Sequence, residues 1–165
     1  MKNKIALKFT LILTLIHGSI AHAQVTFQQT YGGSLGDYGR CVQQTNDGGY
    51  IIAGETNSFG SSNYDVYLIK TSSTGTSQWT KTFGGSGAAS DLGKSVMQTI
   101  DGGYIIGGNT TGFGAGLEDI YLVKAASDGS LEWTKTFGGT MRDYGYSIQQ
   151  TIDGGYIIGG YTQSF

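Results

Sequence analysis

The chain repeats a set of short motifs three times, and this repetition limits its possible folds more than any other feature. The segment Asp-Gly-Gly-Tyr-Ile-Ile begins at Asp47, Asp101 and Asp153, at intervals of 54 and 52 residues. An aromatic residue followed by two glycines begins at Tyr31, Phe83 and Phe137, with the same two intervals in reverse order. Strand-rich repeats of about 50 residues are typical of β-propeller blades, whereas helical arrays have shorter repeats with helical periodicity.

Each repeat is expected to contain four short strands. In the complete second repeat, the pattern predicts strands over 95–99, 104–108, 119–124 and 131–137. Asp101-Gly102 predicts a hairpin tip, because Asp bonds nearby backbone and Gly accepts a positive φ. The third segment is apolar on both faces, which predicts a strand buried between layers. The fourth alternates polar and apolar residues, as a solvent-facing outer strand does.

The predicted fold class is therefore all-β, with β-propeller-type blades of four antiparallel strands. Residues 24–33 are expected to form an outer strand without its blade, 34–85 a first blade, 86–139 a second, and 140–165 the first hairpin of a third. This is an incomplete ring of about two and a half blades, and we expect the sequence to be a fragment, because propellers typically have four or more. An open stack of solenoid-like units is the alternative, although the repeat is long for one solenoid coil.

The first 23 residues have the features of a signal peptide. Three lysines precede a short apolar stretch over 9–16, and Ala21-His22-Ala23 supplies a small-x-small cleavage pattern. The apolar stretch is shorter than the roughly 20 residues that span a bilayer. The sequence therefore predicts a secreted or cell-surface protein that starts at Gln24 and does not insert into the membrane after signal removal.

Removal of the signal peptide changes the composition of the chain. His17 and His22 leave with it, so no imidazole remains for a Ser-His pair or a metal site. Three of the 10 basic residues leave as well, and the remaining seven face 12 acidic residues, a net charge of −5. This balance argues against nucleic acid as a partner. Cys41 is the only cysteine and aligns with Ser95 and Ser147, so we interpret it as a small packed residue.

In combination, the motifs resemble a known family. The order is Phe-Gly-Gly, then Asp-Tyr-Gly-x-Ser-Ile-Gln-Gln-Thr-x-Asp-Gly-Gly-Tyr-Ile-Ile-Gly-Gly, then Asp-x-Tyr-Leu-Ile-Lys, then Trp-Thr-Lys-Thr-Phe-Gly-Gly. It is similar to the secreted β-propeller-like repeats of bacterial and archaeal cell-surface proteins. The resemblance covers nearly all of the chain after residue 23. It implies a surface protein, often longer and often with a C-terminal sorting domain, and it implies neither catalytic residues nor a defined ligand.

The repeated acids are interpreted as structural. Asp47, Asp101 and Asp153 stand alone beside two glycines, which favours turn stabilisation. Five further acids at the starts of predicted strands are expected to bond backbone donors: Asp37, Asp65, Asp91, Asp119 and Asp143. Calcium at one of these loops is the alternative. We expect no cofactor and no metal site.

Catalysis is not expected either. Glu55, Glu118 or Glu132 could supply a carboxylate pair for glycoside hydrolysis. However, no acid pair stands apart from the repeat and no histidine remains. The predicted class is a non-catalytic module for adhesion or binding. A purely structural spacer and the propeller of an extracellular carbohydrate-active enzyme are the alternatives.

The candidate binding residues are those that differ between repeats. Glu55 aligns with Asn109 and Tyr161, and we expect this variable position to mark a ligand face on the loops. Tyr64 is the fourth candidate, one of several tyrosines expected in or near loops. Aromatic rings beside amides and hydroxyls suit a glycan or a surface protein, the two expected classes of partner.

Overall fold

The computed structural model describes residues 27–60 and 63–164, and the proposed signal peptide lies outside them. The described chain is all-β, with ten antiparallel strands in sheets of four, four and two, and it contains no helix. The strands are β1 (Asp37–Gln44), β2 (Tyr50–Thr56), β3 (Asp65–Thr71), β4 (Ser77–Phe83), β5 (Asp91–Gln98), β6 (Tyr104–Thr110), β7 (Asp119–Ala125), β8 (Leu131–Phe137), β9 (Asp143–Gln150) and β10 (Tyr156–Thr162).

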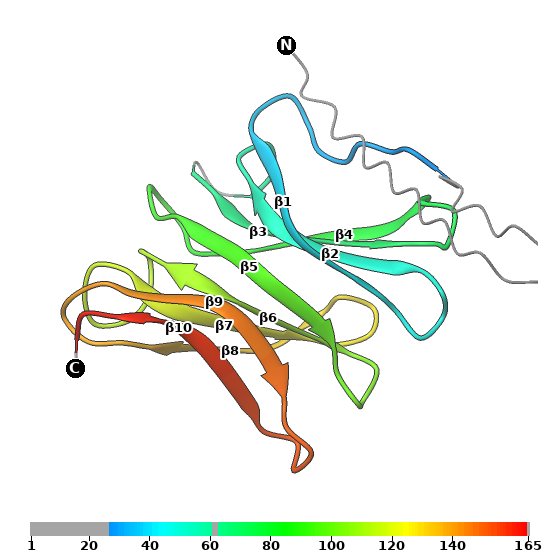
Figure 1. Cartoon of the computed structure of the whole chain (residues 1–165). Coiled ribbons are helices and arrows are strands. Elements are labelled where there is room, and N and C mark those ends of the chain that lie inside the picture. Colours follow the sequence, from blue (N-terminus) through cyan, green and yellow to red (C-terminus); the bar gives the residue numbers. More distant parts are fainter. Residues whose placement is uncertain (1–26, 61–62, 165) are drawn as a thin grey trace, which may run out of the picture.

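The three sheets follow the three repeats. Sheet A has the order β1-β2-β3-β4, sheet B the order β5-β6-β7-β8, and sheet C consists of β9 and β10. Within each sheet, every strand pairs with the next one along the chain, so each sheet is a simple antiparallel meander. Figure 1 shows sheets A, B and C side by side in chain order, from cyan to red. The prediction of four-stranded antiparallel units without helix is confirmed.

The hairpin tips lie where the Asp-Gly-Gly motif predicts them. Gly48, Gly102 and Gly154 have φ values of 79°, 83° and 86°, a region that favours glycine. At the first tip, Asp47 accepts a hydrogen bond from the Gly49 amide at 3.0 Å, and the same bond recurs at the other two. The aspartates therefore stabilise the turns, as the sequence indicates.

Burial separates the third strand of each complete sheet from the fourth. β3 is buried along its whole length, and β7 is buried except at the half-buried Ile120. By contrast, β4 and β8 are mostly exposed, as their alternating sequences predict. The core of the molecule consequently lies between the sheets, mainly on β2, β3, β5, β6 and β7.

Neighbouring sheets pack through one recurring interface. β5 lies against β1, β2 and β3, and β9 lies in the same way against β5, β6 and β7. A tryptophan of the fourth strand contacts a tyrosine of the next sheet, Trp79 with Tyr104 at 5.7 Å and Trp133 with Tyr156 at 5.9 Å between ring centroids. Cys41 is half-buried beside the core between sheets A and B, as expected of a small packed residue.

The N-terminal segment takes an equivalent place beside sheet A. Phe27 aligns with Trp79, and its ring lies 5.7 Å from that of Tyr50, the residue equivalent to Tyr104. Residues 24–26 lie outside the described residues, and residues 27–36 belong to no strand of the structure, so the expected outer strand over 24–33 is not formed by 27–33. Their position is nevertheless that of a fourth strand placed before the next sheet, because they make the same ring contact.

The first strand of every sheet contains a β-bulge. The register shifts between Gly39 and Cys41 in β1 and between Gly93 and Ser95 in β5, and β9 shifts at the corresponding point opposite Gly159 and Gly160. A bulge inserts one unpaired residue and turns the strand locally. The inserted residues are Arg40, Lys94 and Tyr146, so the bulges place a different side chain at the same point of each sheet.

Candidate ligand-binding face

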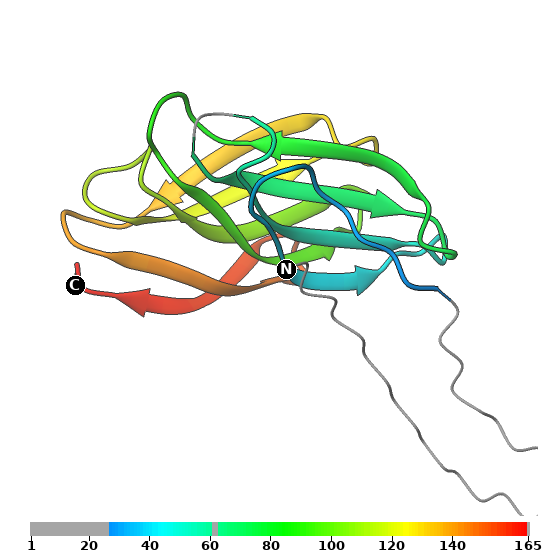
Figure 2. The same ribbon diagram turned by 90° about the horizontal axis from the view of Figure 1, so that it is seen from above.

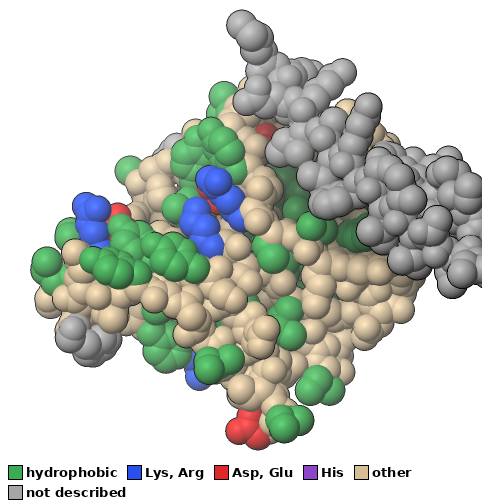
Figure 3. All heavy atoms as spheres, viewed as in Figure 1, with side chains coloured by type: hydrophobic (Ala, Val, Ile, Leu, Met, Phe, Trp, Pro, Cys, Tyr) green, Lys and Arg blue, Asp and Glu red, His purple; other side chains and the backbone are tan. Residues whose placement is uncertain are grey.

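Residues that differ between repeats gather around the three bulges. β1 contacts β5 and β5 contacts β9, which brings the bulges of the three sheets together along one side of the molecule. We call this side the bulge face, and it comprises Tyr38, Arg40, Glu55, Tyr64, Lys94, Asn109, Tyr144, Tyr146 and Tyr161. Figure 3, a space-filling view from the same side as Figure 1, shows basic side chains beside hydrophobic ones on this surface.

Glu55 connects sheets A and B at the centre of the bulge face. It lies on β2, not in a loop as the sequence suggested, and only 3% of its surface is exposed. Arg40 of the same sheet donates its Nε–H to Glu55 Oε1 at 2.8 Å, and Lys94 Nζ of sheet B lies 3.6 Å from Oε2. The hydrogen bond with Glu55 raises the pKa of the Arg40 guanidinium. Two cations therefore share one carboxylate, which leaves a net positive charge at this point.

Aromatic rings border the positive group. The guanidinium of Arg40 lies 5.2 Å from the ring centroid of Tyr38, a cation–π distance, and Tyr38 lies 5.9 Å from Tyr64. A hydrogen bond with Tyr38 raises the pKa of the Tyr64 phenol. The carbonyl oxygen of Tyr64 accepts the amide N–H of Asp91 at 2.7 Å, which fixes Tyr64 at the junction of sheets A and B.

The two other variable positions lie on strands as well. Asn109 occupies the place of Glu55 on β6 and is 4% exposed, whereas Tyr161 occupies it on β10 and is 46% exposed. Tyr161 stacks on Tyr144 at 6.1 Å, and Tyr144 stacks on Tyr146 at 6.2 Å with nearly parallel rings. The third repeat thus presents a row of three tyrosines where the first presents an ion pair.

Two acceptor atoms of the bulge face are buried without a hydrogen-bond donor. They are Glu55 Oε2 and Asn109 Oδ1, at equivalent positions of the first and second repeats. Lys94 is close enough to Glu55 Oε2 for an ion pair but not for a hydrogen bond. Both atoms are shielded from solvent by the surrounding strands, and Glu55 Oε2 faces the Lys94 ammonium.

The repeated carboxylates serve the fold. Asp37, Asp91 and Asp143 each accept an amide N–H from the second glycine of the preceding aromatic-Gly-Gly segment, at 2.8, 2.8 and 2.9 Å. Burial raises the pKa of the Asp91 carboxyl. Within residues 27–60 and 63–164, no three His, Cys, Asp or Glu side chains converge in a way that could hold a metal ion.

The hairpin aspartates bind lysines of the third strands. Lys70 lies 2.8 Å from Asp47 and Lys124 lies 3.0 Å from Asp101, and both lysines are almost fully buried. The bond from Lys70 lowers the pKa of Asp47, and the bonds from Thr99, Gly103 and Lys124 lower the pKa of Asp101 to about 2. These pairs fix the hairpin against the sheet.

The glutamates considered for catalysis have cationic partners. Lys124 also binds Glu132 at 3.2 Å, and Arg142 binds Glu118 at the same distance. Glu55 binds Arg40 and Lys94. All three carboxylates therefore take part in ion pairs between strands or loops, which accounts for them structurally.

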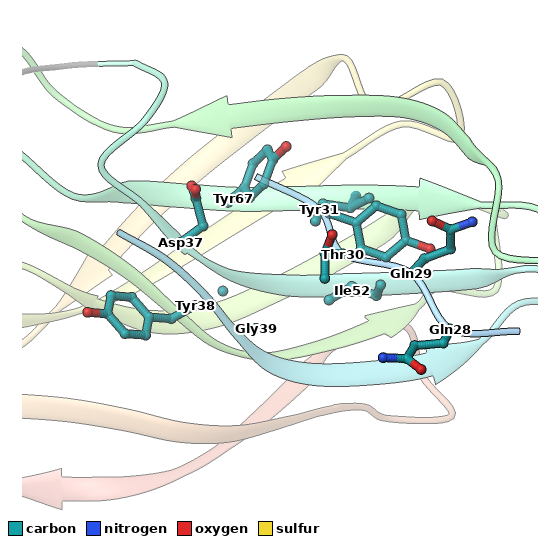
Figure 4. A pocket seen from close by; sticks show the side chains of 11 residues that line it. Gln28, Gln29, Thr30, Tyr31, Asp37, Tyr38, Gly39, Ile52 and Tyr67 are labelled. Carbon is teal, nitrogen blue, oxygen red and sulfur yellow. The ribbon is translucent and has the colours of Figure 1, made fainter. Parts of the chain in front are cut away.

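A cleft of about 210 Å³ lies beside sheet A. Figure 4 shows its wall, where the segment from Gln28 to Tyr31 runs alongside β1, β2 and β3 near Ile52 and Tyr67. Tyr31 donates its hydroxyl to the carbonyl of Gly75 at 2.6 Å, which attaches the segment to the turn after β3. The cleft thus lies along a structural contact, and its lining also includes Tyr38 of the bulge face.

Sequence reasoning named four of these residues and missed the others at the bulges. Glu55 and Tyr64 lie at the A–B junction, Asn109 at the B–C junction, and Tyr161 on sheet C. Arg40, Lys94 and Tyr146 were not identified, although each is the differing residue in an otherwise repeated Asp-x-Gly-x-small segment. A position-by-position alignment of that segment would have shown the variation, but not the bulge that exposes it.

Comparison with known proteins does not assign this chain to a family. No protein-family model matches the chain, and no curated protein matches it. The described residues contain no helix with the length and apolar character needed to cross a bilayer.

Proposed function

We propose that this chain is a non-catalytic module for extracellular binding or adhesion, whose partner is a glycan or a surface protein. In this proposal, residues 1–23 direct export, and the three sheets are successive blades of a β-propeller-type ring. The recurring packing of each first strand against the preceding sheet supports that arrangement, because successive propeller blades also pack on one another in one repeated way.

The observation that carries the proposal is the contrast between repeated and variable positions. The hairpin acids, their lysines and the tight glycines recur from repeat to repeat and have structural partners. The variable residues lie together on the bulge face, where they form an ion pair in one repeat and a tyrosine row in another. Scaffold positions that recur and clustered positions that vary are expected of a repeat protein that presents a binding surface.

The composition of the bulge face favours a glycan among the two partner classes. Tyrosine rings offer flat apolar surfaces to the C–H faces of sugar rings. Tyr144, Tyr146 and Tyr161 form a row of such rings on sheet C. Arg40 and Lys94 add positive charge, which suits acidic sugars.

Binding is tested by screening the full chain on a glycan array that includes acidic sugars, followed by titration of any hit. Tyr161→Ala and Tyr146→Ala should each weaken binding about tenfold, the loss of one stacked ring. Phe137→Ala is the matched control, because Phe137 is an aromatic residue of similar exposure on the outer strand β8. Equal losses in all three variants would reject the bulge face as the binding surface, and glycan hydrolysis abolished by Glu55→Gln would reject the non-catalytic assignment.

Export is tested separately. When the chain is expressed with its first 23 residues in a bacterial host, the processed protein should leave the cytoplasm and begin at Gln24 by N-terminal sequencing. Retention of an unprocessed protein in the cytoplasm would contradict the proposed signal peptide, whatever the array shows.

A further inference from the structure

The two cations at the junction of sheets A and B have hydrogen-bond donors that the protein does not use. Arg40 directs both Nε–H and Nη2–H to Glu55 Oε1, which leaves Nη1 without an acceptor among residues 27–60 and 63–164. Lys94 Nζ lies 3.6 Å from Glu55 Oε2, too far for a hydrogen bond, and donates to no other residue of the described chain. One carboxylate therefore holds two cations in place without using all their donors.

A buried lysine of sheet A shows the contrast. Lys70 Nζ donates to Asp47, to Gln78 and to a backbone carbonyl oxygen, and its side chain is 4% exposed. The three N–H bonds of that ammonium are thus all used within the fold. The side chains of Lys94 and Arg40 are 22% and 44% exposed. Both cations at the junction therefore reach solvent with donors still available.

The charged group belongs to one junction and not to the repeat. At the equivalent positions between sheets B and C, Asn109 stands in place of Glu55 and Tyr146 in place of Lys94. The hairpin ion pairs, by contrast, recur in sheets A and B with the same residue types. A feature that the scaffold does not require at the next junction is expected to serve a ligand of this one.

We propose that the junction of sheets A and B is an anion subsite, at which a carboxylate or sulfate ester of an acidic sugar accepts hydrogen bonds from Lys94 Nζ and Arg40 Nη1. The inference rests on the proposed function, because it takes the sugar as the ligand of the bulge face. Two cations against one carboxylate leave one positive charge, which a single anionic substituent balances. Glu55 is only 3% exposed, so it holds the cations and does not contact the ligand.

An aromatic ring beside the cations favours a sugar over an acidic peptide. Tyr38 is 47% exposed, and the Arg40 guanidinium lies 5.2 Å from its ring centroid. A sugar whose anionic group binds the two cations can lay the C–H face of its ring against this phenol. The subsite therefore combines charge recognition with one flat apolar contact.

The first test uses the full chain, labelled with nitrogen-15, and three methyl glycosides that share one ring: a glucuronide, a glucoside 6-sulfate and the neutral glucoside. We expect saturable NMR shifts of the Arg40 and Lys94 backbone amides and of the Arg40 Nε–H with at least one charged glycoside, and none with the neutral one. The glycoside that binds identifies the anionic group. Sodium acetate and sodium sulfate should bind several-fold more weakly, because they lack the ring that contacts Tyr38.

Variants then assign the donors. Lys94→Met keeps the apolar stem and should weaken binding of the charged glycoside about tenfold, the effect of one charge-assisted hydrogen bond. Lys94→Arg keeps the charge and should retain most of the affinity. The matched control is Lys81→Met, an exposed lysine on β4 of the same sheet, which should leave the affinity unchanged. Figure 2 shows β1 (cyan) and β4 (green) at opposite margins of sheet A, so the control lies away from the subsite.

Several outcomes would overturn the proposal. They are the absence of saturable shifts, equal binding of neutral and charged glycosides, unchanged binding by Lys94→Met, and an equal loss in Lys81→Met. Acetate or sulfate binding as tightly as the glycosides would mean an adventitious ion only. A glutamate-rich peptide that binds more tightly than both acidic glycosides would assign the cations to a protein partner instead of a sugar.

The result is separable from the test of the proposed function. Glycan-array hits that keep their affinity in Lys94→Met would contradict the anion subsite and leave the bulge face as the binding surface. Specific binding of a charged glycoside without any array hit would support the subsite and contradict the adhesion role.

Discussion

Three isoleucines at equivalent positions of the repeats provide a sharp test of how the sheets cover one another. Ile51, Ile105 and Ile157 each follow the tyrosine of an Asp-Gly-Gly-Tyr-Ile-Ile segment. Sheet B covers Ile51 and sheet C covers Ile105, so both are fully buried, but Ile157 is 61% exposed. The same substitution to alanine should therefore have very different effects on stability in the second and third repeats.

The expected magnitudes follow from burial. Replacing isoleucine by alanine removes three carbons, about 2.4 kcal/mol of transfer free energy at about 0.8 kcal/mol each. At Ile105 the remaining cavity adds to this loss, and we expect a decrease of about 3–4 kcal/mol in the free energy of unfolding. At Ile157 about two-fifths of the side chain is buried and no closed cavity forms, so we expect about 1 kcal/mol.

Equilibrium urea unfolding, followed by tryptophan fluorescence and circular dichroism, measures the difference. Ile51→Ala serves as a second buried control and should match Ile105→Ala within the spread of core substitutions. A loss at Ile157 as large as that at Ile105 would refute the reasoning, because it would mean that the outer face of sheet C is covered in solution.

Three further predictions concern a carboxylate, two glycines and the central ion pair. The pKa of Asp101 is lowered from 3.8 to about 2 by Thr99, Gly103 and Lys124, so its stabilising contribution is complete above about pH 4 and disappears as the pH falls through 2. When the free energy of unfolding is measured across this pH range, Asp101→Asn should lose less stability on acidification than the parent protein does. Gly159→Ala should be neutral or slightly stabilising in thermal unfolding, because the nearest atom to an added Cβ is 4.0 Å away. Gly160→Ala should lower the melting temperature by several degrees, because its Cβ would collide with the Tyr144 carbonyl. Equal melting temperatures of the two variants would contradict the close approach of β9 and β10 at Gly160. Glu55→Gln should lower the free energy of unfolding by about 1–3 kcal/mol, because it leaves Arg40 and Lys94 facing each other without a carboxylate, and added salt should reduce the difference.

Much of the local structure could be predicted because it depends on neighbouring residues. Asp47, Asp101 and Asp153 bond amides two residues further along, and the glycine after each aspartate adopts a positive φ. The alternation of β4 and β8 and the two-sided apolar character of β3 and β7 likewise follow from side-chain periodicity.

The candidate site was only partly predictable, because it depends on register. The sequence identified Glu55 and Asn109 as variable but suggested loops, whereas both lie buried on strands. It offered no sign that Arg40 and Lys94, 54 residues apart, both approach Glu55. A one-residue bulge reverses which face a side chain occupies, and the sequence pattern does not reveal it.

The sequence by itself determined the number of repeats, the four-stranded unit and the hairpin tips, because each strand and turn is encoded within a short segment and the segments recur in a fixed order. The tertiary structure alone decided which variable side chains meet and which isoleucine a neighbouring sheet covers. Ile105 and Ile157 stand in the same local sequence. They differ in what lies against them, and that depends on neighbours supplied by distant parts of the chain.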